Sequence, residues 1–418
     1  MNNSLLLKNV ILAGKTTDIR ICAGQFQKIA SGLIPQENED VFDAKGNLAI
    51  LPPFYNAHTH AAMTLMRGYA DDLELFRWLS EMIWPLEAQL TPEDVYNGSR
   101  LAILEMIRSG TVFFNDMYWF QKETVRAAEE MGIRACIGML QLSNVSANTD
   151  NEWLKENRHT FSSRIQTALA PHAIYTVDTG TLRKTGEIAS GQNEIIHIHL
   201  AETKKEFDDC ISQHNMTPVQ YLDTLGLLTP RTILAHSIYL TEDDIRLIAK
   251  RNSVPVHIPA SNMKLASGRF SGENIIKHHS RITLGTDGAC SNNNLSMIEE
   301  MKLAALLAKL GSENPETFPA PFVYDMASRR GAEAFGLHAG VIQEGYLADA
   351  ILVDLNTPVM TPNFHTISNM VYAADPSVID SVICDGKFLM KHRIVKGEQE
   401  IIAAARESAH KLVERLKK

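Results

Sequence analysis

The chain has 418 residues, more than the usual single domain, so we expect either a large barrel with an appended domain or two ordinary domains. Hydrophobic residues make up 45% and charged residues 21%, which are averages of folded globular proteins. The net charge of -9, without a block of consecutive lysines or arginines, disfavours nucleic acid as a partner and favours a small, neutral or weakly charged substrate.

The N-terminal segment and the cysteines indicate the compartment. The segment MNNSLLLKNVILAG lacks the basic leader and the cleavage site of a secretion signal. No stretch approaches the roughly 20 uninterrupted apolar residues that span a bilayer. The five cysteines are odd in number, far apart and without a CxxC pair, which fits reduced thiols. We therefore expect a cytoplasmic protein that does not associate with membranes.

Short apolar, β-branched runs alternate with helical patterns over residues 47–288, which is typical of βα units around a parallel sheet. Eight runs are NLAILPPFYNA, GTVFFND, RACIGMLQL, RIQTALAP, EIIHIHLA, RTILAHS, SVPVHIPA and RITLGTDG. Helices are predicted between them at 92–109, 122–131, 180–189 and 243–251. The first has Thr91 as a predicted N-cap before Pro92. Eight units predict a (β/α)8 barrel of the α/β class.

The two flanks have a different pattern. Residues 5–30 and 345–355, and then SVICDGKFLM and RIVKG, are short β-rich pieces joined by Gly and Asp turns. Because these pieces lie at both ends of the chain, we expect one small composite β-sandwich from residues 1–50 and 345–418. The barrel, residues 51–344, is then inserted between its halves. The stretch from about Glu398 to Lys418 predicts a terminal helix.

Barrel enzymes place their active-site groups at the carboxyl ends of the strands. The first predicted strand ends in Asn56-Ala57-His58-Thr59-His60. Alternate strand residues share a face, so the imidazoles of His58 and His60 can project together into the barrel mouth and share a metal ion. Two hydrogen-bonded core or loop histidines would give the same local sequence.

Three further strand ends carry the same residue types. The fifth strand ends around His199, the sixth at His236 and the eighth at Asp287. Metal-binding residue types at four strand ends converge on one axial point, which unrelated core histidines rarely do. Three imidazoles and one carboxylate, with a position open for water, suit a divalent metal ion. Zn2+ is the first candidate, followed by Fe2+ or Mn2+.

Longer segments make the sequence similar to the amidohydrolase superfamily, in its 5-methylthioadenosine/S-adenosylhomocysteine deaminase branch. The similar segments cover nearly the whole chain: LPPFYNAHTHAAMTLMRGYADDL, WPLEAQLT, APHAIYT, IHLAET, LAHSIYL, PASNMKLASG, LGTDGACSNNNLSM and GVIQEGYLADAILVDL. The resemblance implies the same barrel and composite sandwich. It also implies hydrolytic removal of the 6-amino group of 5-methylthioadenosine, 5-deoxyadenosine, adenosine or S-adenosylhomocysteine, with release of ammonia.

The resemblance further implies one divalent metal ion per chain, with His58, His60, His199 and Asp287 as ligands. A divalent ion lowers the pKa of bound water and so supplies hydroxide at neutral pH. In this scheme Asp287 accepts the proton of that water, and His236 orients it by a hydrogen bond.

Substrate contacts are implied for Glu202, Asp287, Glu87 and His172. Glu202 would donate a proton to N1 of the purine as C6 is attacked. A helix N-cap acid at position 202 is the structural alternative. Glu87 would bind ribose hydroxyls and His172 the nucleoside, against the alternatives of a surface helix acid and a strand-end histidine. His197 has no ligand role in the family, and we expect a hydrogen-bonded core histidine there.

Several other functions stay open. Two-metal hydrolases of the superfamily carry a carboxylated lysine at the end of strand four, where this chain has Pro171-His172, so one metal is favoured. Guanine, cytosine, pterin or triazine substrates are alternatives. A catalytically inactive binding protein on the same barrel is an alternative of a different class. The HxE and PCxxC pattern of deaminases that act on flipped bases is absent. We expect a small-molecule nucleoside as partner and leave homo-oligomerisation open.

The 5-prime group of the substrate is the last prediction from sequence. Relatives that deaminate S-adenosylhomocysteine have an arginine just after strand three and another in the following loop. Here residues 138–145 read GMLQLSNV, and the next arginine is Arg158. A buried carboxylate without a cation is costly, so we expect small, uncharged 5-prime groups unless Arg158 or a neighbouring subunit supplies a cation. The residues expected to line the pocket are Met117, Tyr118, Met139 and Leu140.

Overall fold

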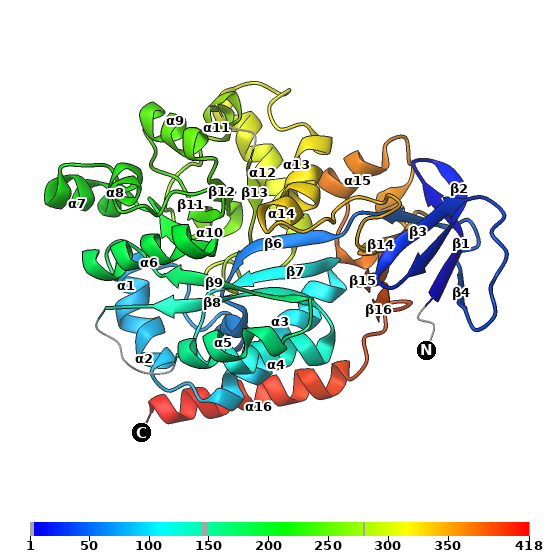
Figure 1. Cartoon of the computed structure of the whole chain (residues 1–418), viewed down its shortest axis with the longest axis horizontal. Helices are drawn as coiled ribbons and strands as arrows, with labels where there is room; N and C mark the ends of the chain where they lie inside the picture. Colours follow the sequence, from blue (N-terminus) through cyan, green and yellow to red (C-terminus); the bar gives the residue numbers. More distant parts are fainter. Residues whose placement is uncertain (1–3, 144–148, 279–280, 418) are drawn as a thin grey trace.

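A computed structural model describes residues 4–143, 149–278 and 281–417. Within these residues, eight parallel strands follow one another around a barrel in the order β13-β12-β11-β10-β9-β8-β7-β6 (Figure 1). They are β6 (Phe54–Thr59), β7 (Thr111–Asp116), β8 (Arg134–Gln141), β9 (Ile165–Pro171), β10 (Ile195–Leu200), β11 (Thr232–His236), β12 (Val254–His257) and β13 (Thr283–Leu284). The predicted (β/α)8 barrel is confirmed.

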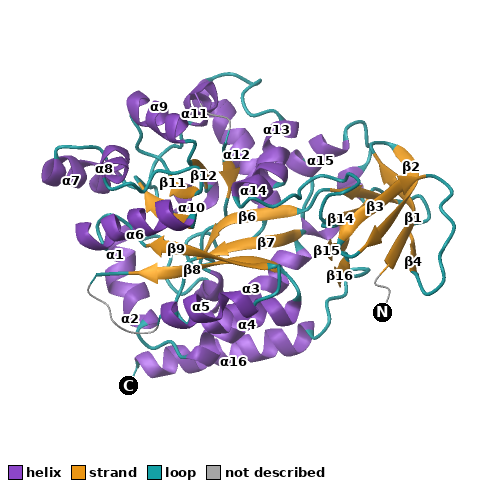
Figure 2. Ribbon diagram, viewed as in Figure 1, coloured by secondary structure: helices purple, strands orange, loops and turns teal. Residues whose placement is uncertain are grey.

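Helices surround this barrel (Figure 2). They are α3 (Pro92–Arg108), α4 (Gln121–Met131), α5 (Asn151–Asn157), α6 (Thr179–Gln192), α7 (Lys204–His214), α8 (Pro218–Thr224), α9 (Glu242–Arg251), α10 (Pro259–Lys264), α11 (Gly272–His278), α12 (Met297–Ser312), α13 (Ala320–Ala327) and α14 (Arg329–Ala334). All four predicted helices are present. Thr91 caps α3, since its side chain accepts from the amide of Asp94 and the Asp94 side chain accepts from the amide of Thr91.

An excursion between β6 and α3 was not predicted. It contains η1 (Ala61–Met66), α1 (Leu75–Trp78), the π-helical turn η2 (Leu79–Ile83) and α2 (Trp84–Glu87). Its apolar side chains, among them Trp78 and Leu86, form a buried cluster of their own with Tyr118 and with Leu412 near the C-terminus. Each piece is too short for a helical period to be read from the sequence.

The flanking segments form one continuous sheet in the order β16-β15-β14-β5-β1-β2-β3, with β4 also paired to β1. The strands are β1 (Ser4–Leu12), β2 (Lys15–Cys22), β3 (Gln25–Ala30), β4 (Asp40–Asp43), β5 (Leu48–Leu51), β14 (Ala350–Asp354), β15 (Ile379–Cys384) and β16 (Lys387–Met390). Phe42 of β4, which pairs with β1, and Phe388 of β16, at one end of this order, lie on strands that do not pair with each other, yet their ring centroids are 5.1 Å apart. The sheet therefore curls around one apolar core, as a small sandwich does.

Two details of the strand prediction are wrong. The run NLAILPPFYNA contains two strands, because β5 belongs to the composite sheet and only β6 to the barrel. Pro52 and Pro53 lie between them and lack the N–H groups that one continuous ladder would need. The segment RIVKG is not a strand, and pairing there is limited to a bridge between Lys391 and Ile394.

A buried ion pair joins the composite sheet to the barrel. Arg134, the first residue of β8, is 2% exposed and donates from Nε to the fully buried Asp349 carboxylate at 2.8 Å. The Tyr55 hydroxyl of β6 donates to the same carboxylate at 2.9 Å, and Arg134 also pairs with Asp385 at 3.0 Å. The Asp349 carboxylate at this junction thus accepts hydrogen bonds from both Arg134 and Tyr55.

The C-terminal stretch is a helix, as predicted: α16 (Glu398–Leu416) lies along α3 on the outside of the barrel (Figure 1). Asn97 of α3 donates to the hydroxyl of Ser408 at 3.0 Å, and Arg108 pairs with Glu398 at 2.7 Å. Among the described helices, none combines the length and the apolar character needed to cross a membrane. The five cysteines are all free thiols.

We expect the substitution Asp349→Leu to lower the free energy of unfolding by about 3 kcal/mol or more, because it leaves the Arg134 charge buried without its main partner. Urea unfolding of the metal-loaded protein, followed by far-UV circular dichroism, measures this. Glu242→Leu is the control, since it removes an exposed i,i+4 ion pair with Arg246. Equal unfolding midpoints for the two variants would show that the junction adds no stability.

Candidate active site

The four predicted ligands converge at one end of the barrel. His58 lies on β6 and His60 directly follows this strand, His199 lies on β10, and Asp287 comes from the segment after β13. The Nε2 atoms of His60 and His199 are 3.3 Å apart. The Oδ1 atom of Asp287 lies 3.4 Å from His58 Nε2 and 3.2 Å from His60 Nε2. His236 is close as well, because its ring nitrogen lies within 4.8 Å of ligand atoms of His58 and Asp287.

Hydrogen bonds at Nδ1 orient the three imidazoles. The partners are the carbonyl of Met117 for His60 at 2.6 Å, the carbonyl of His172 for His199 at 2.8 Å and the His197 Nε2 atom for His58 at 2.7 Å. A carbonyl can only accept, so His60 and His199 carry their proton on Nδ1 and present a lone pair at Nε2. His197 is the hydrogen-bonded core histidine that the sequence predicted, and its contact orients His58 as an outer partner of a metal ligand does.

This donor set fits a divalent metal ion. In a tetrahedral zinc site with bonds of about 2.0–2.1 Å, neighbouring donor atoms lie about 3.3–3.4 Å apart. The measured separations between His60, His199 and Asp287 agree with this value. A metal cation bound by His60 Nε2 and His199 Nε2, 3.3 Å apart, would replace the proton that otherwise lies on His60. The buried His58 Nε2 atom also has no hydrogen-bond partner among the described residues.

Electrostatics favour the ionisation states that bind metal for His58, His199 and Asp287. Burial lowers the pKa of His58 to about 4 and that of His199 well below its usual range, so both are neutral at pH 7. Burial raises the pKa of Asp287, but the close imidazoles of His58 and His60 outweigh this and hold it well below its ordinary value. Burial lowers the pKa of His60, yet the Asp287 carboxylate raises it to about 9. The same carboxylate charge that attracts this proton would attract a metal cation.

Asp287 is held in place by contacts across the barrel seam. The ladder of β13 ends at Leu284, three residues before it. The amides of Thr286 and Asp287 donate to the carbonyl of His58 at 3.1 and 3.0 Å. The Asn56 side chain donates to the Thr286 hydroxyl at 2.7 Å and accepts from the Thr286 amide at 3.1 Å. Asn56 was not singled out from sequence, although its position two residues before His58 gives it the same strand face.

Glu202 is 5% exposed and lies beside the cluster, with Oε2 3.8 Å from Nε2 of His236. Burial raises the pKa of the Glu202 carboxyl and the nearby His236 lowers it by less, so this pKa lies above its ordinary value. The capping alternative for Glu202 is wrong, because Thr203 is the N-cap of α7 and accepts from the amide of Glu206. Glu206 in turn accepts from the amides of Ala201 and Glu202, both at 2.9 Å.

Glu87 and His172 lie next to the same cluster. Glu87 ends α2 in the excursion after β6 and is 8% exposed, so it is not a surface acid. Burial raises its pKa, while Tyr118 and His60 lower it by less. The His172 ring follows β9 and lies 4.7 Å from the His199 ring, centroid to centroid. Burial lowers the pKa of His172 to about 3, so the ring is neutral.

Two of the residues expected to line the substrate pocket, Met139 and Leu140, lie on opposite faces of β8. Leu140 packs with Met117 and Ala170 in a small cluster inside the mouth. Met139 points the other way and lines a cavity between the strands and α6, with Leu169. The prediction for Met139 is therefore wrong, since adjacent residues of a strand face opposite sides.

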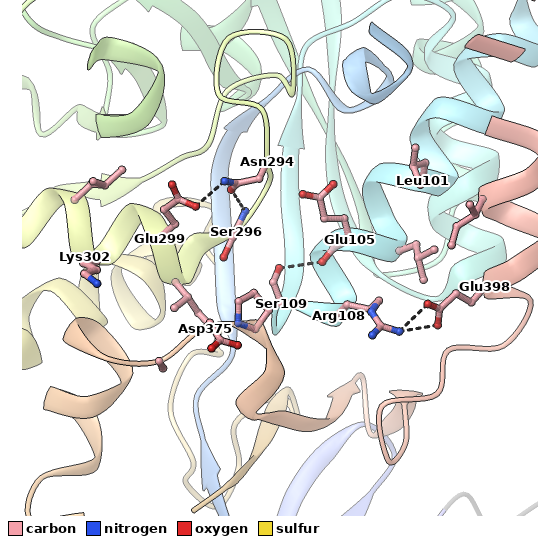
Figure 3. Close-up of a pocket in the computed structure, with 16 residues that line it drawn as sticks. Leu101, Glu105, Arg108, Ser109, Asn294, Ser296, Glu299, Lys302, Asp375 and Glu398 are labelled. Atoms are coloured by element: carbon pink, nitrogen blue, oxygen red, sulfur yellow. Dashed lines mark hydrogen bonds and ion pairs between the residues drawn. The ribbon is translucent and has the colours of Figure 1, made fainter. Parts of the chain in front are cut away.

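A cavity of about 780 Å³ lies elsewhere, outside the barrel between α3 and α12 (Figure 3). Its charged lining includes the Arg108–Glu398 pair and Glu299, which accepts from Asn294. None of the clustered histidines lines it. The chemistry described above is therefore separate from this cavity.

Comparisons with known proteins agree with the fold. Residues 49–389 match the model of the amidohydrolase family. A 5'-deoxyadenosine deaminase of Methanospirillum hungatei is 47% identical over an alignment of 387 residues. The alignment covers 91% of this chain and 86% of that protein. A 5-methylthioadenosine/S-adenosylhomocysteine deaminase of Archaeoglobus fulgidus is 46% identical and covers 87% of this chain and 88% of its own length.

The chain therefore belongs to the amidohydrolase family. A crystal structure of an adenosine deaminase from Xanthomonas campestris with bound zinc superposes with a TM-score of 0.92. It is 32% identical in sequence and covers 98% of both chains.

We expect the purified protein to bind about one transition-metal ion per chain, because the donor set forms one tetrahedral site. Metal analysis of His199→Ala should show less than a tenth of the wild-type content at equal metal activity. His236→Ala should keep its metal. A requirement for two metal equivalents for full activity, or loss of metal in His236→Ala alone, would contradict this ligand set.

Proposed function

We propose that the chain is a metal-dependent hydrolytic deaminase that converts an adenine nucleoside to the inosine-type product and releases ammonia. The observation that supports this most is Glu202, a buried carboxyl whose pKa is raised beside a cluster of metal-binding residues. A protonated carboxyl in this place suits a substrate with a basic ring nitrogen next to the attacked carbon. Relatives at 46–47% identity named for adenine nucleosides favour this reaction over guanine, cytosine, pterin or triazine chemistry.

His58, His60, His199 and Asp287 would hold one divalent ion, zinc by the donor set and by the zinc-bound relative. When bound there, the ion lowers the pKa of water and makes hydroxide available at neutral pH. The presence of every proton-handling residue in one buried cluster disfavours an inactive binding protein. We also infer a cytoplasmic enzyme that acts on a small nucleoside.

The protons can be followed through the chain's own residues. Asp287 takes one proton from the attacking water, and His236 orients that water by a hydrogen bond. Glu202 gives its proton to N1 as the water oxygen bonds to C6, and this proton stays on N1 in the product. The proton on Asp287 passes to the 6-amino group, which leaves as ammonia. The second proton of the water returns to Glu202 as C6 becomes a carbonyl.

Glu87 and His172 would orient the nucleoside. Glu87 lies at the end of α2, where its carboxylate can accept hydrogen bonds from ribose hydroxyls. His172 is neutral and follows β9 at the mouth of the barrel. A neutral ring beside the histidine ligands adds no further positive charge to the site.

The mouth favours a small, uncharged 5-prime group. No lysine or arginine occurs in residues 138–150, the end of β8 and the loop that follows it. Arg158 pairs with Glu194, which immediately precedes β10. His199 is five residues further along that strand, about 16 Å at 3.3 Å per residue, so Arg158 lies toward the opposite end of the barrel. Leu140 and Met117 form an apolar cluster on the mouth side.

Glu202→Gln should keep its metal and lose deaminase kcat by at least ~100-fold, because the amide cannot protonate N1. The loss of the adenine absorbance band of adenosine measures the rate. The exposed Glu187→Gln on α6 serves as the matched control and should behave as wild type. Near-normal turnover by Glu202→Gln would remove Glu202 from the mechanism.

We expect kcat/KM to be higher for 5-methylthioadenosine, 5-deoxyadenosine or adenosine than for S-adenosylhomocysteine, because the mouth gives the amino-acid carboxylate no cation from the loop after β8. Parallel assays on one metal-loaded preparation make the comparison. A preference of tenfold or more for S-adenosylhomocysteine would overturn it. Lys205 lies at the start of α7, with its Nζ 5.7 Å from the centre of the Phe76 ring. It would then be the first cation to test by substitution.

A further inference from the structure

The segment after β12 contributes no predicted metal ligand, yet it contacts all three side chains that would move protons. The Ser261 hydroxyl donates to Asp287 Oδ2 at 2.6 Å. The Asn262 Oδ1 atom lies 2.9 Å from Nδ1 of His236. The Ser267 hydroxyl donates to Glu202 Oε1 at 3.4 Å. The three residues are between 0% and 5% exposed, so water does not compete for these contacts.

We propose that Ser261, Asn262 and Ser267, called here the orienting segment, are positioning residues for the deamination. Each holds one proton-handling side chain at the angle that its task requires. The inference rests on the proposed function and deepens it, because the three contacts assign a task to a stretch of the mouth that binds neither metal nor substrate in the scheme above.

Ser261 fixes the rotation of the Asp287 carboxylate. Oδ1 of Asp287 faces the Nε2 atoms of His58 and His60, while Oδ2 accepts from Ser261. The Gly288 amide also donates to Oδ1 at 2.9 Å. A hydroxyl on Oδ2 therefore keeps the other oxygen directed at the metal-binding cluster, as outer partners of metal ligands do.

Asn262 selects the tautomer of His236. A side-chain carbonyl oxygen can only accept, so Nδ1 of His236 carries the proton and Nε2 presents a lone pair. That Nε2 atom faces the Glu202 carboxyl at 3.8 Å. His236 can thus accept a hydrogen bond from the attacking water. Ser267 contacts the other oxygen of Glu202 over a longer distance, so we expect a weaker effect there.

The backbone of the orienting segment is itself held rigidly. The Asn262 amide donates to the Ile258 carbonyl at 3.1 Å, and the Ser267 amide donates to the Asn262 carbonyl at 2.9 Å. Glu300 of α12, fully buried, accepts from the amide of Ala260 at 3.1 Å and from the Asn292 side chain at 2.6 Å. Glu300 therefore ties the start of α10 to the loop that follows Asp287.

The test compares Ser261→Ala, Asn262→Leu, Asn262→Asp and Ser267→Ala in the metal-loaded enzyme. Met263→Ala is the control, because Met263 lies on α10 and is 41% exposed. We expect Ser261→Ala and Asn262→Leu to lower kcat by ~10–100-fold, the usual effect of removing an outer partner, with KM changed by less than about threefold. Ser267→Ala should lower kcat by less. Asn262→Asp, which keeps the acceptor, should recover most of the rate that Asn262→Leu loses.

Metal affinity, measured by competition with a chelator, separates positioning from a general structural role. Only Ser261→Ala should bind metal more weakly, because only its partner is a predicted ligand. Asn262→Leu and Ser267→Ala should keep wild-type affinity and melting temperature. The proposal is overturned if kcat of Ser261→Ala and Asn262→Leu stays within twofold of wild type. It is also overturned if Asn262→Asp has no higher kcat than Asn262→Leu, or if Asn262→Leu loses activity, bound metal and melting temperature together. Equal metal affinity of Ser261→Ala and Met263→Ala would overturn the role of Ser261 in positioning Asp287. If the wild-type enzyme deaminates no adenine nucleoside, it is the proposed function that fails.

Discussion

The amides of Thr286 and Asp287 donate to the carbonyl of His58, and these two hydrogen bonds close the barrel where its first and last strands meet. β13 is two residues long and could not hold Asp287 by ladder pairing alone. The Asn56 side chain adds a donor and an acceptor across the same seam. The strand that supplies two histidines thus also fixes the carboxylate, so closure of the barrel and assembly of the metal-binding cluster are one event.

Around this seam, burial determines which side chains are charged more than ion pairing does. Low solvent access keeps His58, His172 and His199 neutral, and it raises the pKa of Glu202 while the close imidazoles keep Asp287 ionised. The pKa values of two carboxyl groups in one small space are thereby shifted in opposite directions by their surroundings. An acid for N1 and a base for water can coexist at one pH for this reason.

The sequence predicted the barrel because apolar runs and helical periods are local signals, and it predicted the histidine and aspartate cluster because strand ends share one face of a barrel. It did not predict Asn56, Ser261 or Ser267, whose partners lie 230, 26 and 65 residues away. No local pattern records such contacts. Met139 is a different case, since strand alternation alone would have separated it from Leu140.

The composite sheet sets an order of events during synthesis. β5 pairs with β14, so Leu51 cannot pair until Ile351, 300 residues later in the chain, has been synthesised. At about 5–20 residues per second, this interval is roughly 15–60 s. Throughout it, the edge of β5 and the apolar face of β1 have no C-terminal partner, while the barrel emerges between them. Until β14 has been synthesised, this unpaired strand edge is therefore open to pairing with other chains.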